Sequence, residues 1–305
     1  MIKKLFSLLL AAVFFVQTAG IAAAAEPDTM QTKLEVVEKA AYGGVQTGAL
    51  LDRVSKLEKD FSSQQPKQSV MQRVDSLYDL IFSNETSPSL VTQMNAIEWG
   101  ITRSVSMKSI QQRVTDMEMT MAGKPSEGTY RDRIDQLAEY AFGSKEIPLV
   151  STNVPANTLM KIATVTPINA KNLKAGDEIK YQAAEDVIEN GVLLIAKGAP
   201  GVGTVTKVVQ ARNFGRDAEV NIDFKTMRAM DGTDIETMLG EESKKKMESV
   251  AMAAGASVAG MVLLGPIGII GGAFVHGKNI DLPEGTELYI QTKNDVTLYG
   301  LTVEQ

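Results

Sequence analysis

A 20-residue unit repeats six times without gaps within residues 26–143, and this repeat constrains the fold more than any other feature. Each unit has an apolar position, a basic position three residues later, an apolar residue directly after it, and another apolar residue three further on. The basic positions are Lys33, Arg53, Arg73, Gln93, Arg113 and Arg133, of which Gln93 alone lacks a charge. A fixed period of this length is typical of a repeat built from one supersecondary unit.

Within a unit the apolar residues are four, three and four positions apart, as in Leu50, Val54, Leu57 and Phe61. This spacing marks one stripe of an amphipathic helix of about 14 residues. Gly and Pro residues separate the units, which predicts six short helices joined by brief turns. Because a helix this short is marginal alone in water, the stripes must pack against neighbouring units or against other copies of the chain.

Charged residues of the units form the first candidate interaction site. Its members are Arg53, Arg73, Arg113, Arg133, Glu58, Glu98 and Glu118. An Arg and a Glu five positions later do not face each other on one helix, so they could pair between adjacent units or between subunits. Two interpretations stay open: solvated charges beside an apolar seam, which contribute little to stability, or a ladder that recognises a partner. We expect Trp99 to pack beside the seam of the fourth unit. Similar arrays occur in uncharacterised exported bacterial proteins, a resemblance that implies a scaffold role.

Residues 1–25 have the three parts of a secretory signal peptide: Lys3 and Lys4, an apolar stretch, and a run of Ala before Glu26. We therefore expect export to the periplasm or the outer membrane. The chain contains no Cys, which excludes a disulfide framework and a thiolate nucleophile. Its net charge of −6 argues against a nucleic-acid partner, because such binding requires Lys and Arg to neutralise phosphates.

The sequence pattern changes after the helical repeat domain, residues 26–143. Residues 144–157 contain Pro148 and Pro155 and predict an extended linker. Beyond it, short segments separated by Gly, Asn and Asp predict a small β-barrel or sandwich over residues 158–305. The predicted strands are 159–166, 178–188, 192–196, 203–211, 219–224, 287–292 and 296–303. The expected fold class is therefore α+β multidomain, with a helical array followed by a barrel.

Residues 250–275 carry no charge and interrupt this strand-rich region. We expect residues 247–277 to form a glycine-rich helical hairpin bent at Pro266, inserted in the barrel. Small residues in it would let helices approach closely at a membrane or oligomer contact. The candidate contact residues are Gly255, Gly260, Gly265, Pro266, Gly268 and Gly272. The alternative is a hairpin packed on the barrel as core, because the same spacing serves packing in either solvent.

Turn motifs follow one another along residues 154–303 in an order similar to that of the β-barrel domain of conjugation and type IV secretion outer-membrane core proteins. The motifs lie at 154–158, 175–179, 184–187, 195–198, 201–203, 214–216, 230–233 and 282–286. Asn157 stands where that family usually has Gly, although Asn also adopts positive φ. In the family, an insertion between late barrel strands forms a helical pair that crosses the outer membrane in an oligomeric ring. The resemblance therefore implies a membrane-associated hairpin here.

No residue pattern predicts catalysis or a cofactor. His276 is the one His, and without Cys it does not complete a usual zinc site. We therefore expect a non-enzymatic structural or assembly protein of the bacterial cell envelope. Its repeats would mediate self-association or docking to an envelope protein, and its hairpin would meet the outer membrane or other copies. The alternative is a soluble periplasmic binding or adaptor module, with a protein or peptidoglycan ligand and the hairpin packed as core.

Overall fold

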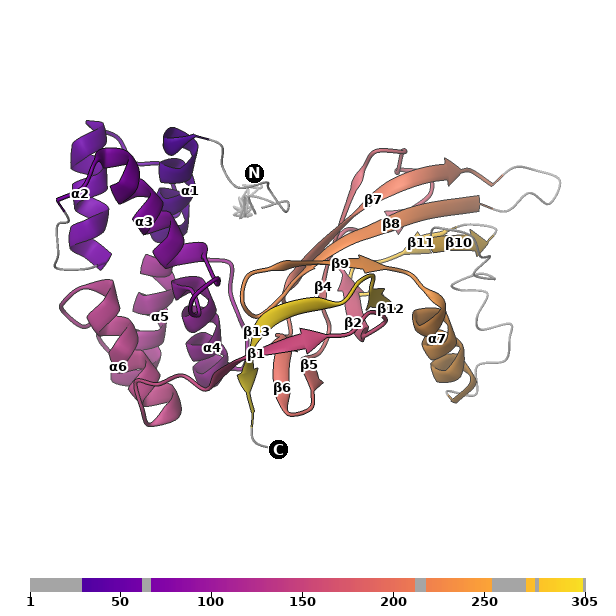
Figure 1. Cartoon of the computed structure of the whole chain (residues 1–305). Helices are drawn as coiled ribbons and strands as arrows, with labels where there is room; N and C mark the ends of the chain where they lie inside the picture. The colour runs from indigo at the N-terminus through magenta and orange to yellow at the C-terminus, as the bar shows by residue number, and fades with distance from the viewer. Residues whose placement is uncertain (1–28, 62–66, 212–217, 254–272, 278–279, 304–305) are drawn as a thin grey trace, which may run out of the picture.

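The computed structural model describes residues 29–61, 67–211, 218–253, 273–277 and 280–303. It is an α+β protein with an N-terminal helical array and a C-terminal β region (Figure 1). We call residues 29–143 the arm and residues 149–303 the β region. The coarse fold class expected from the sequence is confirmed.

The six repeat units each form one helix of the arm. These are α1 (Met30–Tyr42), α2 (Leu50–Phe61), α3 (Val70–Phe82), α4 (Leu90–Thr102), α5 (Ile110–Ala122) and α6 (Tyr130–Phe142). A Ser or Thr begins all of them except α2, and its side chain accepts a hydrogen bond from a first-turn backbone N–H. Gly43, Gly123 and Gly143 end three helices in the left-handed conformation, which glycine adopts without steric cost.

The arm folds back on itself instead of forming an open row of helices. Helix α1 contacts both α3 and α5, while α6 contacts both α2 and α4. Phe61 at the end of α2 meets Tyr130 at the start of α6, with ring centroids 5.0 Å apart. The apolar stripes of all six helices therefore share one core within the chain, whereas the sequence had left packing against neighbouring units or against other copies open.

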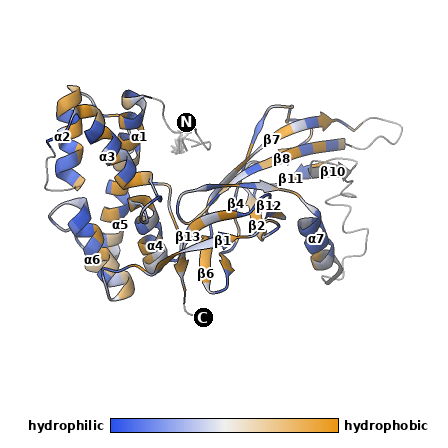
Figure 2. Ribbon diagram, viewed as in Figure 1, coloured by the Kyte–Doolittle hydropathy of each residue, from blue (hydrophilic) through white to orange (hydrophobic). Residues whose placement is uncertain are grey.

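A closed antiparallel barrel of six strands forms the centre of the β region. Its strands, in spatial order, are β8 (Ala218–Arg228), β7 (Pro200–Val209), β4 (Glu178–Ala183), β2 (Leu159–Thr164), β12 (Glu287–Thr292) and β9 (Asp234–Met238). Pairing of β9 with β8 closes the ring, which leaves these strands without a free edge along the paired segments. Figure 2 shows apolar and polar residues alternating along the strands, as a sheet with one buried face requires.

Further strands surround the barrel. A second sheet has the order β1 (Leu149–Val154), β13 (Val296–Thr302), β6 (Val192–Ile195) and β5 (Val187–Glu189). The short strands β3 (Ile168–Asn169) and β11 (Asp281–Leu282) pair with each other, and β10 (Ala273–Gly277) extends the barrel sheet beside β8.

The predicted linker at 144–157 is wrong for its central part. Residues 149–154 form β1, which pairs with β13 in continuous antiparallel register from Leu149 opposite Leu301 to Val154 opposite Val296. Pro148 and Pro155, which suggested a linker, stand directly before and after the strand. At these places a missing backbone N–H breaks no hydrogen bond of the ladder. The predicted strand at 178–188 is likewise divided into β4 and β5.

The insertion at 247–277 differs from the predicted helical hairpin at its C-terminal end. It is entered by helix α7 (Glu241–Ala253), but residues 273–277 form strand β10 on β8, with Ala273 opposite Ile222 and Gly277 opposite Ala218. Aromatic and β-branched residues at Phe274 and Val275 favour a strand there. The candidate contact residues Gly255, Gly260, Gly265, Pro266, Gly268 and Gly272 lie outside the described residues, as does the expected signal peptide, 1–25. In the described ranges, no helix has the length and apolar character needed to cross a membrane.

Candidate functional site: the charge ladder and the interface between arm and β region

Each Arg of the repeat pairs with the Glu fifteen positions before it, on the preceding helix. The four pairs are Arg53–Glu38, Arg73–Glu58, Arg113–Glu98 and Arg133–Glu118, with N–O distances of 2.5 to 2.7 Å. The repeat has a fifth pair of such positions, between α3 and α4. There Tyr78 stands in place of the Glu and Gln93 in place of the Arg, so no ion pair forms between them. We call the four pairs the ladder. Of the two pairing modes expected, the structure has the one between adjacent units.

The ladder charges are not solvated, so the interpretation as solvated flank charges is wrong. The Glu side chains are at most 10% exposed and the Arg side chains at most 13%. The cause is that the pairs lie between helices and not on the outer face of one helix. Recognition of a partner by the ladder stays a prediction, and such a partner would compete with hydrogen bonds made inside the arm.

Glu38 belongs to the ladder although it was absent from the predicted site. Besides Arg53, it accepts a hydrogen bond from the backbone N–H of Gln46 at 2.9 Å. Glu98 accepts one from the N–H of Ser106 in the same way, at 3.1 Å. These carboxylates therefore hold the loop that follows their own helix. The signal that could have identified Glu38 is its register, since it stands in the first unit where Glu58 stands in the second.

Arg113 has the most buried guanidinium of the ladder. Burial lowers the pKa of Arg113, whereas the hydrogen bond to Glu raises the pKa of Arg53, Arg73 and Arg133. Arg113 donates to Glu98 at 2.8 Å and to the side-chain oxygen of Asn95 at 2.7 Å. A buried cation of this kind depends on both acceptors.

Helix α4 joins the arm to the β region by polar contacts to a turn. The side-chain NH2 of Asn84, just before α4, donates to the carbonyl of Asp231 at 3.0 Å. The side chain of Asn95 donates to the carbonyl of Met230 at 2.8 Å, and both carbonyls lie in the turn between β8 and β9. These bonds connect residues more than a hundred positions apart in the chain.

Apolar side chains complete the interface. Ala96 and Trp99 pack with Leu193, Met230 and Leu301 of the β region. The indole N–H of Trp99 donates to the Asp186 carboxylate at 3.1 Å. Trp99 therefore packs against the β region, whereas the sequence predicted packing beside the seam of its own unit.

The unit that departs from the repeat is the unit that contacts the β region. At the place of Ala96 the other units have Val36, Lys56, Ser76, Asp116 and Gln136. At the place of Trp99 they have Lys39, Lys59, Asp79, Met119 and Glu139. The outer face of α4 has lost its charges because it is covered, and this loss was visible in the sequence.

Asp231 holds the contacted turn in place from within. Its carboxylate is 4% exposed and accepts the backbone N–H groups of Thr233 at 2.9 Å and Tyr299 at 3.0 Å. Burial raises the pKa of Asp231. The bond from Thr233 closes the β8–β9 turn and the bond from Tyr299 ties that turn to β13, so the carbonyls that α4 binds keep a fixed direction.

Arg103 borders the interface in a strained conformation. It ends α4 with φ 56°, where α1, α5 and α6 have Gly. Its guanidinium lies 4.3 Å from the centroid of the Trp99 ring, a cation–π contact that offsets part of the backbone cost.

The polar and apolar contacts of this site hold the arm against the β region. Across the residues that have described positions, no three His, Asp or Glu side chains gather to hold a metal ion. His276 lies on β10, opposite Glu219 in the register of β8.

Comparison with protein-family models and with curated protein sequences gives no match. Among solved structures, ComB10 of the Com type IV secretion system of Helicobacter pylori matches with 12% identity and a TM-score of 0.26. The match covers 48% of this chain and 89% of that chain.

Proposed function

We propose that this chain is a non-enzymatic structural or assembly protein of the bacterial cell envelope with two separate contact ends. One end is the arm, for self-association or docking to an envelope protein. The other is the apolar segment 254–272, for a membrane or other copies. The observation that supports this most is spatial: the arm joins the β region on one side, whereas α7 and β10, which flank the segment in sequence, lie on the opposite side (Figure 1).

The uncharged composition of the apolar segment favours a nonpolar contact for it. Residues 250–275 carry no charge, and apolar surface is unfavourable in water. The described barrel core is filled by other residues, among them Tyr181 and Phe224, whose rings are 5.4 Å apart. We assign the segment to a membrane or a second copy, and the vesicle experiment tests this against the alternative in which the segment is core.

The arm has exposed apolar side chains that could make the proposed contact with another copy or an envelope protein. Leu51, Met71, Met107 and Met119 are 53, 60, 52 and 50% exposed. Exposed apolar residues are ordinary when single, but Met is common at binding surfaces because its side chain adapts to different partners. We assign the self-association or partner-docking role to exposed apolar side chains of the arm, and not to the ladder, whose charges are satisfied internally.

Vesicle flotation tests the proposal on the mature chain, residues 26–305. We expect the wild-type chain to float with phospholipid vesicles and to resist carbonate extraction. A variant with residues 254–272 replaced by Gly and Ser at unchanged length should keep its circular dichroism spectrum and stay in the soluble fraction. The matched control is Leu51→Gln with Met71→Gln in the arm, which should float like the wild type.

The alternative adaptor function predicts a different result in the same experiment. If the segment is core, the Gly/Ser variant unfolds, and the wild-type chain stays soluble in the presence of vesicles. Either observation would reject the proposed membrane contact.

A further inference from the structure

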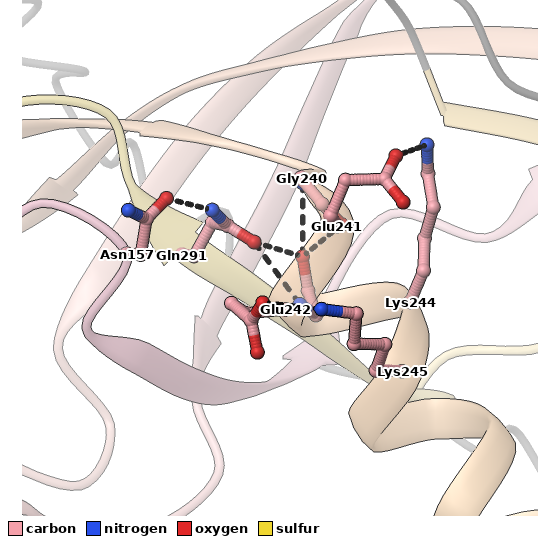
Figure 3. Close-up of polar contacts among 8 residues, drawn as sticks. Asn157, Gly240, Glu241, Glu242, Lys244, Lys245 and Gln291 are labelled. Carbon is pink, nitrogen blue, oxygen red and sulfur yellow. Dashed lines mark hydrogen bonds and ion pairs between the residues drawn. The ribbon is translucent and has the colours of Figure 1, made fainter.

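We infer that Asn157, Gln291 and Ser243 form a latch that fixes helix α7 on the barrel, with Asn157 as its positioning residue (Figure 3). The inference rests on the proposed function in one respect: α7 leads directly into the apolar segment. By holding α7, the latch fixes the helix from which the chain continues into that segment.

Gln291 is the central member of the latch. It lies on β12 and is 1% exposed. Its side-chain oxygen accepts the backbone N–H of Ser243 at 3.0 Å and lies 3.1 Å from the Ser243 hydroxyl. Its side-chain nitrogen donates to the Asn157 side-chain oxygen at 2.5 Å. One buried amide therefore connects the first turn of α7 with the turn between β1 and β2.

Asn157 supplies the acceptor that the other end of the Gln291 amide requires. The backbone N–H of Ser243 can only donate, so the Gln291 oxygen must point toward α7. The Gln291 NH2 group must then point toward residue 157 and requires an acceptor there. Residue 157 is exposed, so a residue without an acceptor would leave this NH2 group to water, and the amide would be free to turn its oxygen away from α7.

The backbone at Asn157 is itself fixed to β12. Its φ is 70°, and its N–H donates to the carbonyl of Thr292 at 2.9 Å. The side chain of Thr292 in turn donates to the carbonyl of Pro155 at 2.7 Å. The acceptor oxygen of Asn157 is thus presented from a turn that cannot easily move relative to Gln291.

Helix α7 has few other attachments to the barrel among its described side chains. Lys244 and Lys245 pair with Glu241 and Glu242 at 3.1 and 2.8 Å, within the helix itself. Met247 joins the barrel core, and the Lys246 ammonium lies 5.9 Å from the centroid of the Tyr289 ring on β12. Because an isolated 13-residue helix is marginal in water, its position depends strongly on the latch.

Gly240 packs directly against the side chain of Gln291. A Cβ at this position would lie 2.3 Å from the amide carbon of Gln291, so the chain entering α7 passes directly against the Gln291 side chain. The backbone N–H of Gly240 donates to the Ser243 hydroxyl at 2.9 Å, which closes the first turn of the helix around the latch.

Hydrogen exchange of the mature chain, read by mass spectrometry, tests the latch with two variants at one position. Asn157→Gly removes the acceptor and suits the left-handed backbone, whereas Asn157→Asp keeps an acceptor at the same place. We expect amides of residues 241–253 to exchange about tenfold faster in Asn157→Gly, the effect of one lost hydrogen bond. Asn157→Asp should match the wild type, and peptides from α5 and β7 should be unchanged in both.

Unchanged exchange of α7 in Asn157→Gly would overturn the inference, as would loss of protection in Asn157→Asp. General loss of protection along the chain in Asn157→Gly would show that Asn157 serves the whole fold and not a local latch. Flotation of the same samples separates the two proposals. If the wild type does not float, the proposed membrane contact fails and the exchange result stands; if it floats and α7 exchange is unchanged, the latch alone fails.

Discussion

At the scale of single residues, the ladder places full charges where water does not reach them. Glu98 and Arg113 illustrate this, with side chains 10% and 5% exposed. Removing one partner of a buried pair leaves the other charge without compensation, which costs far more than the intact pair contributes.

Substitution of Arg113 by Met should therefore strongly destabilise the folded chain. We expect Arg113→Met to lower the free energy of unfolding by about 3–5 kcal/mol. The matched control is Lys108→Met, because Lys108 pairs with Asp116 across side chains 58% and 40% exposed, and a change within about 1 kcal/mol is expected there. Urea unfolding measures both, and equal losses would contradict burial as the cause.

The buried Asp231 predicts a pH dependence with a definite sign. Burial raises the pKa of this carboxyl in the folded chain, so folding favours its protonated form. Its contribution to stability is complete below the unfolded pKa of about 3.9 and is lost as pH rises through the folded pKa. Asp231→Asn removes the titration. The unfolding free energy of the wild type minus that of the variant should fall as pH rises from about 4 toward 7. A difference that is flat or rising would refute this.

Gly201 is fixed by its contact with an aromatic ring inside the barrel. A Cβ at this position would lie 2.1 Å from the Tyr181 ring. Gly201→Ala should therefore cost at least about 1–3 kcal/mol of unfolding free energy, the usual range for overpacking. Gly44→Ala is the control, since no atom lies within 4 Å of a Cβ there. Equal effects of the two substitutions in a thermal melt would contradict the packing argument.

At the scale of elements, α4 shows how one member of a repeat is changed to serve a second role. It keeps the ladder on one side through Glu98, and on the other side it contacts the β region through Ala96 and Trp99. Because both faces of α4 are covered, it lacks the polar residues that most other units carry at the places of Ala96 and Trp99.

Restoring the residue of a neighbouring unit should separate the two parts of the molecule. Ala96→Asp gives α4 the residue that α5 has at Asp116, but places a charge where Ala96 is 0% exposed. We expect calorimetry to show the arm and the β region melting in two transitions, while Asp116→Ala, the reverse change on the exposed helix, melts like the wild type. A single transition in Ala96→Asp would show that α4 does not hold the joint.

Much of the arm could be predicted from the sequence because its information is local. Stripe spacing, breakers and capping residues fall within each 20-residue unit, so the helices were found. Strand β1 was missed because Pro148 and Pro155 suggested a linker and its partner β13 lies at the far end of the chain. The interface was missed for the same reason: Asn84 and Asp231 are 147 positions apart. The ladder residues were identified, but their burial depends on how the helices pack.

At the scale of the whole molecule, the last strand of the β region connects its first strand with the turn between β8 and β9. β13 pairs with β1, the strand that follows the arm. The backbone N–H of Tyr299 on β13 also donates to the Asp231 carboxylate, in the turn that α4 contacts. The joint with the arm is therefore built from the beginning, middle and end of the β region. On the side away from the arm, α7 leads to the apolar segment (Figure 1). This arrangement supports two contacts made at once from opposite ends.

Hydrogen exchange of the mature chain bound to vesicles, compared with the free chain, tests this two-ended arrangement most directly. We predict new protection confined to α7, the segment 254–272 and β10, with α1 to α6 exchanging as in the free chain. Protection on the arm, or no change anywhere on addition of vesicles, would contradict it.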